Sequence, residues 1–218
     1  LRKQWIMQEL QGFDNIHVNL VNEAGLECFP NGDWRPWVDA VRKICGGRID
    51  CIYGGESSYT DWCKQWFPEA EYTLIDPKRT RWPISGTEIR DNPLEHWDYI
   101  IGAARPFFTK RILVAGTESC GKTTITKKLA KMYYTSWSEE FGRYYSEKYL
   151  GGDETAFKSD DFKRIAYLQH EQDLEALRTA NRVCFFDTDA TITFYYSEIY
   201  LGFPVYEVED FIDPSKYD

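Results

Sequence analysis

The organisation of this chain follows from Arg111-Ile-Leu-Val-Ala-Gly116-Thr-Glu-Ser-Cys-Gly121-Lys122-Thr123-Thr124, an apolar run that leads into a glycine-bracketed loop and a helix start. This spacing after a strand and before a helix is that of a phosphate-binding loop. Gly116 and Gly121 let the backbone wrap so that its N–H groups face a phosphate. The sequence therefore predicts a bound nucleoside triphosphate, and the structural alternative is a glycine-containing strand–turn–helix connection.

Two residues of this loop have expected chemical roles. Lys122 should reach the β- and γ-phosphates, and the Thr123 hydroxyl should contact Mg²⁺. The rest of the predicted nucleotide-binding set consists of loop neighbours. They are Gly116, Glu118, Ser119, Gly121 and Thr124.

Composition sets the class of protein. The 218 residues, 43% of them hydrophobic, suffice for one large or two small domains. No run of about 18 apolar residues exists, so we expect no membrane partner. The net charge of −9 argues against a nucleic-acid surface in this segment. Six cysteines without a Cys-x-x-Cys pair favour a reduced, cytoplasmic setting.

Hydrophobic periodicity predicts alternating helices and strands, which is typical of parallel α/β sheets. In the first part we expect strands at 16–21, 50–53 and 72–75, and helices at 34–44 and 58–66. In the second part we expect helices at 123–134, 159–180 and from 188 to 201, and strands at 111–115, 136–141 and 183–187. Pro106 interrupts the order, so we place a boundary between domains 1–107 and 108–218.

Acidic residues follow two of the expected strands. Asp187 ends an apolar strand beside the loop, where a carboxylate can hold Mg²⁺ directly or through water. Asp189 either shares that metal or caps the next helix. Glu140 is either a base or hydrogen-bond acceptor for a substrate hydroxyl, or a solvated acid at a strand end. Aromatic residues near Glu140 either stack on a flat ring or pack in the core. They are Trp137, Phe141, Tyr144 and Tyr145.

A second candidate site lies in the first part. Ser85 and Glu88 have the spacing of a capping box and should open a short helix. Arg90, one turn further on, could contact an anion at that helix start. The alternative is an ordinary capped helix without a ligand.

Six motifs, in this order, resemble those of the NadR-type bifunctional enzymes, which join a nicotinamide mononucleotide (NMN) adenylyltransferase to a ribosylnicotinamide kinase. The motifs are Ile84-Ser-Gly-Thr-Glu-Ile-Arg90, Arg105-Pro-Phe-Phe, Gly116-x₄-Gly-Lys-Thr123, Glu140-Phe-Gly-Arg143, Gly151-Gly-Asp-Glu154 and Asp187-Thr-Asp189. The resemblance implies a Rossmann-like nucleotidyltransferase part in 1–107 and a P-loop kinase in 108–218. It also implies ATP and Mg²⁺ as cofactors, and nicotinamide riboside, NMN and NAD as ligands.

The resemblance also implies roles for particular residues. In the kinase, Lys122, Glu140 and Asp187 would be catalytic, with Thr123 and Asp187 around the metal. Arg143 and Asp189 would bind substrate. In the adenylyltransferase, the ATP-phosphate site would consist of Ser85, Gly86, Thr87 and Arg90, and Trp37 or Trp34 would stack on nicotinamide. The family's His-x-Gly-His motif does not occur in this sequence.

The chain begins inside a charged helix at Leu1 and stops at Asp218, so we interpret it as a segment of a longer protein. We expect it to lack the amino-terminal part of the adenylyltransferase and the carboxyl-terminal part of the kinase. An open sheet edge in the first domain would favour a homo-oligomer. The alternative function is a nucleotide-sensing regulatory P-loop protein that controls NAD metabolism or transcription.

Overall fold

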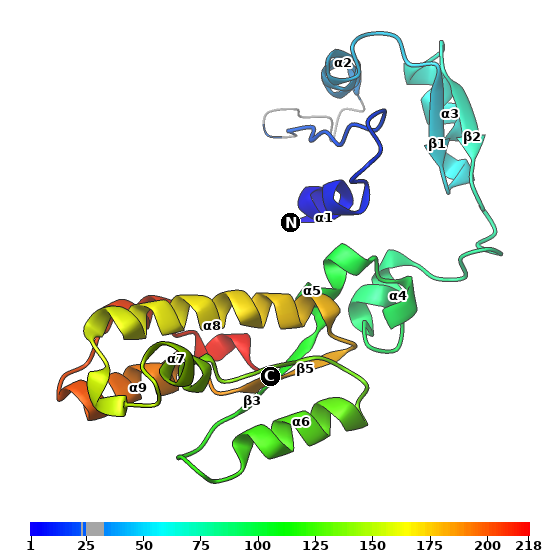
Figure 1. Cartoon of the computed structure of the whole chain (residues 1–218). Coiled ribbons are helices and arrows are strands. Elements are labelled where there is room, and N and C mark those ends of the chain that lie inside the picture. Colours follow the sequence, from blue (N-terminus) through cyan, green and yellow to red (C-terminus); the bar gives the residue numbers. More distant parts are fainter. Residues whose placement is uncertain (23, 25–32) are drawn as a thin grey trace. The chain divides into compact units, whose positions relative to one another are not determined.

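The computed structural model describes residues 1–22, 24 and 33–218, which form two compact units, Leu1–Asp91 and Asn92–Asp218 (Figure 1). Each unit contains a parallel sheet with helical crossovers, so the predicted α/β class is confirmed. In the part of the chain that the structure describes, no helix combines the length and the apolar composition that a bilayer crossing requires.

The first unit is built around one parallel strand pair. Strand β1 (Cys51–Gly54) lies beside β2 (Glu71–Leu74), and α3 (Thr60–Trp66) forms the crossover between them. Helix α2 (Arg35–Ile44) has Pro36 in its first turn, where the missing N–H of proline would have no partner within the helix. The first unit also contains α1 (Arg2–Glu9) and α4 (Gly86–Asp91).

The strand expected at 16–21 is absent: this segment has no regular structure. Its apolar side chains are exposed, with Ile16 at 43% and Leu20 at 69%. A strand requires a hydrogen-bonded neighbour, and the only described ladder in this unit joins β1 to β2. The prediction was wrong because an alternating pattern of polar and apolar side chains does not show whether a neighbouring strand is present.

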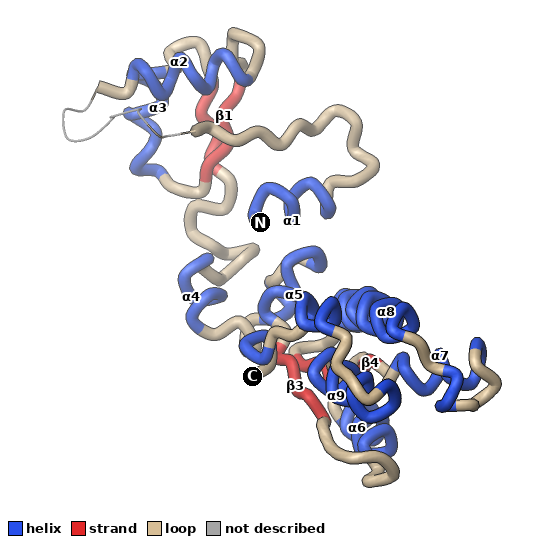
Figure 2. The backbone as a smooth tube through the Cα atoms, turned by 90° about the vertical axis from the view of Figure 1, so that its left-hand side faces the viewer, coloured by secondary structure: helices blue, strands red, loops and turns tan. Residues whose placement is uncertain are grey.

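The second unit has the strand order β3-β5-β4, all parallel. Figure 2 shows the strands of this sheet in red, with β3 and β4 labelled. Strand β5 (Val183–Asp187) is central because it pairs with a strand on each side. Its Cys184 and Phe186 are almost completely buried, as expected for an apolar run in a parallel sheet. Strand β3 (Lys110–Val114) lies on one side and β4 (Trp137–Ser138) on the other. Helices α6 (Lys122–Met132) and α8 (Ser159–Thr179) lie on opposite sides of the strands in Figure 1. The remaining helices are α5 (Arg105–Phe108), α7 (Phe141–Tyr149) and α9 (Ala190–Leu201).

Strand β4 is shorter than the predicted 136–141, because it ends at Ser138 and α7 begins at Phe141. Glu140 is the N-cap residue of α7 instead of a strand residue. Side chains of α8 take the hydrogen bonds of the next peptide groups: Gln169 binds the Glu139 carbonyl and the Phe141 N–H. These contacts end the strand.

The structural boundary between the units lies between Asp91 and Asn92, before the predicted boundary at 107 and 108. Segment 92–107 packs on the second unit through Trp97, whose side chain is 2% exposed. The guanidinium carbons of Arg105 and Arg182 lie 5.6 and 6.0 Å from the Trp97 ring centroid. Arg182 Nε also donates to the Leu94 carbonyl oxygen at 2.9 Å. Pro106 is therefore part of the second unit.

Replacing Trp97 with alanine should lower the free energy of unfolding of the second unit by about 3–5 kcal/mol, because the change opens a large cavity in the core. Denaturation of the full chain, followed by circular dichroism, measures the loss. Trp82→Ala is the control, since Trp82 is 48% exposed, and should cost about 0.5 kcal/mol or less. Equal losses for the two variants would contradict the packing of 92–107 on this unit.

Candidate active site

The loop between β3 and α6 has the backbone form that the glycine spacing predicts. Gly121 caps α6 with φ of 88°, in the left-handed region that glycine adopts without strain. Lys122 is buried at 6% exposure, and its Nζ donates to the Thr117 carbonyl oxygen at 2.9 Å. The ammonium group thus lies over the loop, where a phosphate would meet it.

Thr123 and Asp187 meet at the carboxyl end of the sheet. Parallel pairing sets Val114 opposite Asp187, so the loop that follows β3 begins beside this carboxylate. Thr123 Oγ1 donates to Asp187 Oδ2 at 2.5 Å. Asp187 is completely buried, and its Oδ1 has no hydrogen-bond partner among the described residues.

A hydroxyl and an open carboxylate oxygen are the hard oxygen donors that Mg²⁺ prefers, so these two residues fit that ion. No group of three or more His, Cys, Asp or Glu side chains in the described residues could hold a metal. Magnesium in nucleotide sites usually takes one or two protein ligands and completes its shell with phosphate oxygens and water.

A cavity of about 490 Å³ adjoins the loop, and several of the predicted site residues line it. Glu118, Lys122 and Glu140 all line it. Burial raises the pKa of Glu140, and the negative charges of Asp187 and Glu118 act in the same direction, against Arg143 and Lys122. The Glu140 side chain is 17% exposed and lies 3.3 Å from Arg143 Nη2. Of the two alternatives for Glu140, the structure therefore favours a cavity-lining acid over a solvated one.

One wall of the cavity is aromatic and was not predicted. Phe157, Tyr196 and Tyr200 line it, and the Tyr196 and Tyr200 rings stack with centroids 5.8 Å apart. Tyr200 OH donates to Glu118 Oε1 at 3.0 Å, which ties α9 to the phosphate-binding loop. Burial raises the pKa of Tyr196 to about 12. The available sequence signal was the i, i+4 spacing of two tyrosines on the helix after Asp187.

The residues after β5 have distinct roles. Asp189 is the N-cap of α9 and accepts a hydrogen bond from the Thr191 N–H at 3.1 Å. Of its two predicted roles, helix capping is the one that these contacts match. Thr188 lines the cavity with φ of 80°, a left-handed conformation that is strained for a β-branched residue. Its buried Oγ1 has no partner in the described part of the chain. No sequence pattern signals this strain.

Residues 85–90 of the first unit form the expected capping box. Ser85 N donates to Glu88 Oε2 at 2.7 Å, and Glu88 N donates to Ser85 Oγ at 3.1 Å. Arg90 Nη2 donates to Thr87 Oγ1 at 3.1 Å, and Gly86 is the first residue of α4. The capped helix is thus present, and its role in binding ATP stays a prediction.

Trp34 and Trp37 lie in a tryptophan cluster with Trp62. Their ring centroids are 5.3 to 6.1 Å apart, with edge-to-face packing. Both rings are partly buried. Stacking of either ring on nicotinamide stays a prediction.

Comparisons with known proteins point in one direction. Residues 111–218 match a family model described as AAA domain. The whole chain is 36% identical to "Trifunctional NAD biosynthesis/regulator protein NadR" of Escherichia coli and 35% identical to the protein of that name from Salmonella typhimurium. It spans 53% of each, so the chain covers about half the length of these curated relatives.

Two solved structures of NadR proteins are also similar. One, in complex with NAD and AMP-PNP, has a TM-score of 0.80 and 29% identity over 96% of this chain and 60% of its own. The other, in complex with NR, has a TM-score of 0.81 and 30% identity over 96% of this chain and 59% of its own. These matches confirm the resemblance that the sequence motifs carry: the chain is similar to NadR proteins over its whole length.

Proposed function

We propose that the second unit is an ATP-dependent kinase that phosphorylates nicotinamide riboside at its 5′-hydroxyl, giving NMN for NAD salvage. One observation carries the proposal: Lys122, the partly buried acid Glu140 and an aromatic wall all line a single cavity. The NadR structures in complex with NR, which we take as nicotinamide riboside, and with AMP-PNP support this choice of substrates.

The phosphate side of the reaction uses the loop and β5. Backbone N–H groups of the loop and the start of α6 would hold the ATP phosphates, and Lys122 would contact the transferred group. Thr123 and Asp187 would hold Mg²⁺, because Asp187 Oδ1 is buried without a partner in the described residues. When bound, Mg²⁺ would neutralise the negative charge that develops on the phosphates.

The acceptor side uses Glu140. As the riboside O5′ attacks the γ-phosphorus, the Glu140 carboxylate accepts the hydroxyl proton, and the bond to the β,γ-bridging oxygen breaks to release ADP. The raised pKa of Glu140 brings its proton affinity closer to neutral pH. Arg143 contacts the same carboxylate and lines the cavity, so we assign it to substrate positioning.

The aromatic wall suits the flat pyridinium ring of the riboside. Stacked tyrosines offer the negative faces of their rings to a cation. Asp189 contributes indirectly, because its buried side chain caps α9, the helix that carries Tyr196 and Tyr200.

For the first unit we also propose a part in adenylyl transfer from ATP to NMN, which gives NAD and pyrophosphate. This step rests on the resemblance of Ser85, Gly86, Thr87 and Arg90 to the family's ATP-phosphate motif. Thr87 at the start of α4 and Arg90 in its last turn are both exposed and accessible to an anion.

A second candidate is a nucleotide-sensing regulator. The curated relatives are named as both NAD biosynthesis and regulator proteins, and this name favours the regulator as the second candidate. A sensor would bind riboside and nucleotide without turnover.

Calorimetric titration of the full chain with nicotinamide riboside, in the presence of a non-hydrolysable ATP analogue, should show saturable binding. Adenosine should bind at least about tenfold more weakly, because it lacks the cationic ring that the tyrosine wall favours. With ATP and Mg²⁺ the riboside should be converted to NMN, measured by chromatography. Absence of riboside binding would reject the substrate, and binding without conversion would favour the sensor.

Lys122→Ala should lower kcat for riboside phosphorylation by about 10²- to 10³-fold, because the transition state loses a positive donor at the transferred phosphate. Steady-state kinetics of ADP release measure the change. Lys128→Ala is the matched control, since Lys128 is an exposed lysine of the same helix. A similar loss in both variants would refute the assignment.

Glu140→Gln should lower kcat by about 10²- to 10⁴-fold, because the amide cannot accept the hydroxyl proton. The neighbouring Glu139→Gln, at an exposed position paired with Lys127, should retain activity. Because burial raises the pKa of Glu140, its base form is lost as pH falls through a value above 4.5, the ordinary value for Glu. The acid limb of kcat/KM should therefore lie above 4.5 and disappear in Glu140→Gln.

A further inference from the structure

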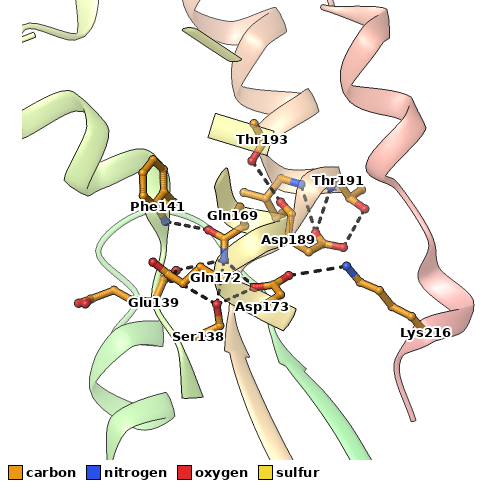
Figure 3. Close-up of polar contacts among 11 residues, drawn as sticks. Ser138, Glu139, Phe141, Gln169, Gln172, Asp173, Asp189, Thr191, Thr193 and Lys216 are labelled. Carbon is orange, nitrogen blue, oxygen red and sulfur yellow. Dashed lines mark hydrogen bonds and ion pairs between the residues drawn. The ribbon is translucent and has the colours of Figure 1, made fainter. Parts of the chain in front are cut away.

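We propose that Gln169 is a positioning residue for Glu140, and that the side-chain amide of Gln169 fixes the backbone on both sides of the Glu140 carboxylate. Gln169 Oε1 accepts from the Phe141 N–H at 2.8 Å, and Gln169 Nε2 donates to the Glu139 carbonyl oxygen at 3.1 Å (Figure 3). The two peptide groups flank Glu140. This inference rests on the proposed role of Glu140 as the base.

The amide replaces a missing strand neighbour. Strand β4 ends at Ser138, and the next peptide groups leave the sheet before α7 begins at Phe141. A primary amide presents a donor and an acceptor side by side, as a strand backbone does, and can hold both groups. Gln169 is only 3% exposed, so water competes weakly for these bonds. Gln169 on α8 therefore fixes the backbone position from which the Glu140 side chain reaches the cavity.

Asp173 determines which end of the amide faces which group. It lies one turn after Gln169 on α8, and its Oδ1 accepts from Gln169 Nε2 at 2.8 Å and from Ser138 Oγ at 2.6 Å. An ionised carboxylate only accepts hydrogen bonds, so Nε2 must face Asp173 and Oε1 is left for the Phe141 N–H. Burial raises the pKa of Asp173, whereas the hydrogen bonds from Ser138 and Gln169 and the Lys216 ammonium, whose Nζ lies 3.8 Å from Asp173 Oδ2, favour the ionised form.

Gln172 provides a natural comparison. Its Nε2 also donates to the Glu139 carbonyl oxygen, at 2.6 Å. Among the described contacts, however, only Gln169 holds the Phe141 N–H. Loss of Gln172 therefore leaves both peptide groups held, whereas loss of Gln169 frees the N–H that follows Glu140.

The test is a double-mutant cycle in the full chain with nicotinamide riboside, ATP and Mg²⁺. Gln169→Met, which keeps the side-chain length without hydrogen bonds, should lower kcat at least about tenfold and leave the KM for ATP within about twofold. Gln172→Ala should keep kcat within about twofold. In the Glu140→Gln background, Gln169→Met should cause no further loss, because the group that it positions is gone.

The outcomes separate the two hypotheses. If Glu140→Gln retains full activity, the proposed base is wrong. If Glu140→Gln is impaired but Gln169→Met is not, or if the two losses multiply, the positioning role is wrong and Gln169 only supports the fold. Thermal melting monitors stability, and should Gln169→Met be unfolded, Gln169→Leu, which likewise cannot accept from the Phe141 N–H, goes through the same cycle with the same criteria.

Discussion

Parallel pairing of β3 with β5 is the constraint on which the site depends. It places Val114 and Asp187 side by side at the carboxyl edge of the sheet, so the phosphate-binding loop and the buried carboxylate leave the sheet together. The Thr123–Asp187 hydrogen bond then joins the first turn of α6 to β5. Ligands of open α/β sheets bind at this edge because loops and helix starts converge there.

Segments distant in the sequence complete the acceptor side. Glu140 comes from the junction of β4 and α7, its backbone is held by Gln169 of α8, and the two tyrosines of the aromatic wall come from α9. The cavity is thus specified by packing between helices, whereas the phosphate-binding loop is specified by a short continuous motif. Under the proposed function, substitutions on α8 and α9 would therefore change the acceptor while the phosphate side stays intact.

This difference explains what the sequence could and could not predict. The loop, β5 and Asp187 were located correctly, because glycine spacing and a buried apolar run are local signals. The strand at 16–21 failed because pairing needs a partner, and β4 was predicted too long because Gln169 binds the next peptide groups. Tyr200 and the strained Thr188 depend on tertiary contacts and backbone angles that periodicity does not encode.

Unfavourable features of the fold gather at the same edge. Asp187 Oδ1 and Thr188 Oγ1 are buried without partners in the described residues, and Thr188 is in a left-handed conformation. Features of this kind each destabilise a folded protein by about 1–3 kcal/mol. A metal ion or substrate hydroxyl that supplies the missing partner binds only the folded chain and so shifts the folding equilibrium toward it. Stability and ligand binding are therefore coupled through the two residues at the end of β5.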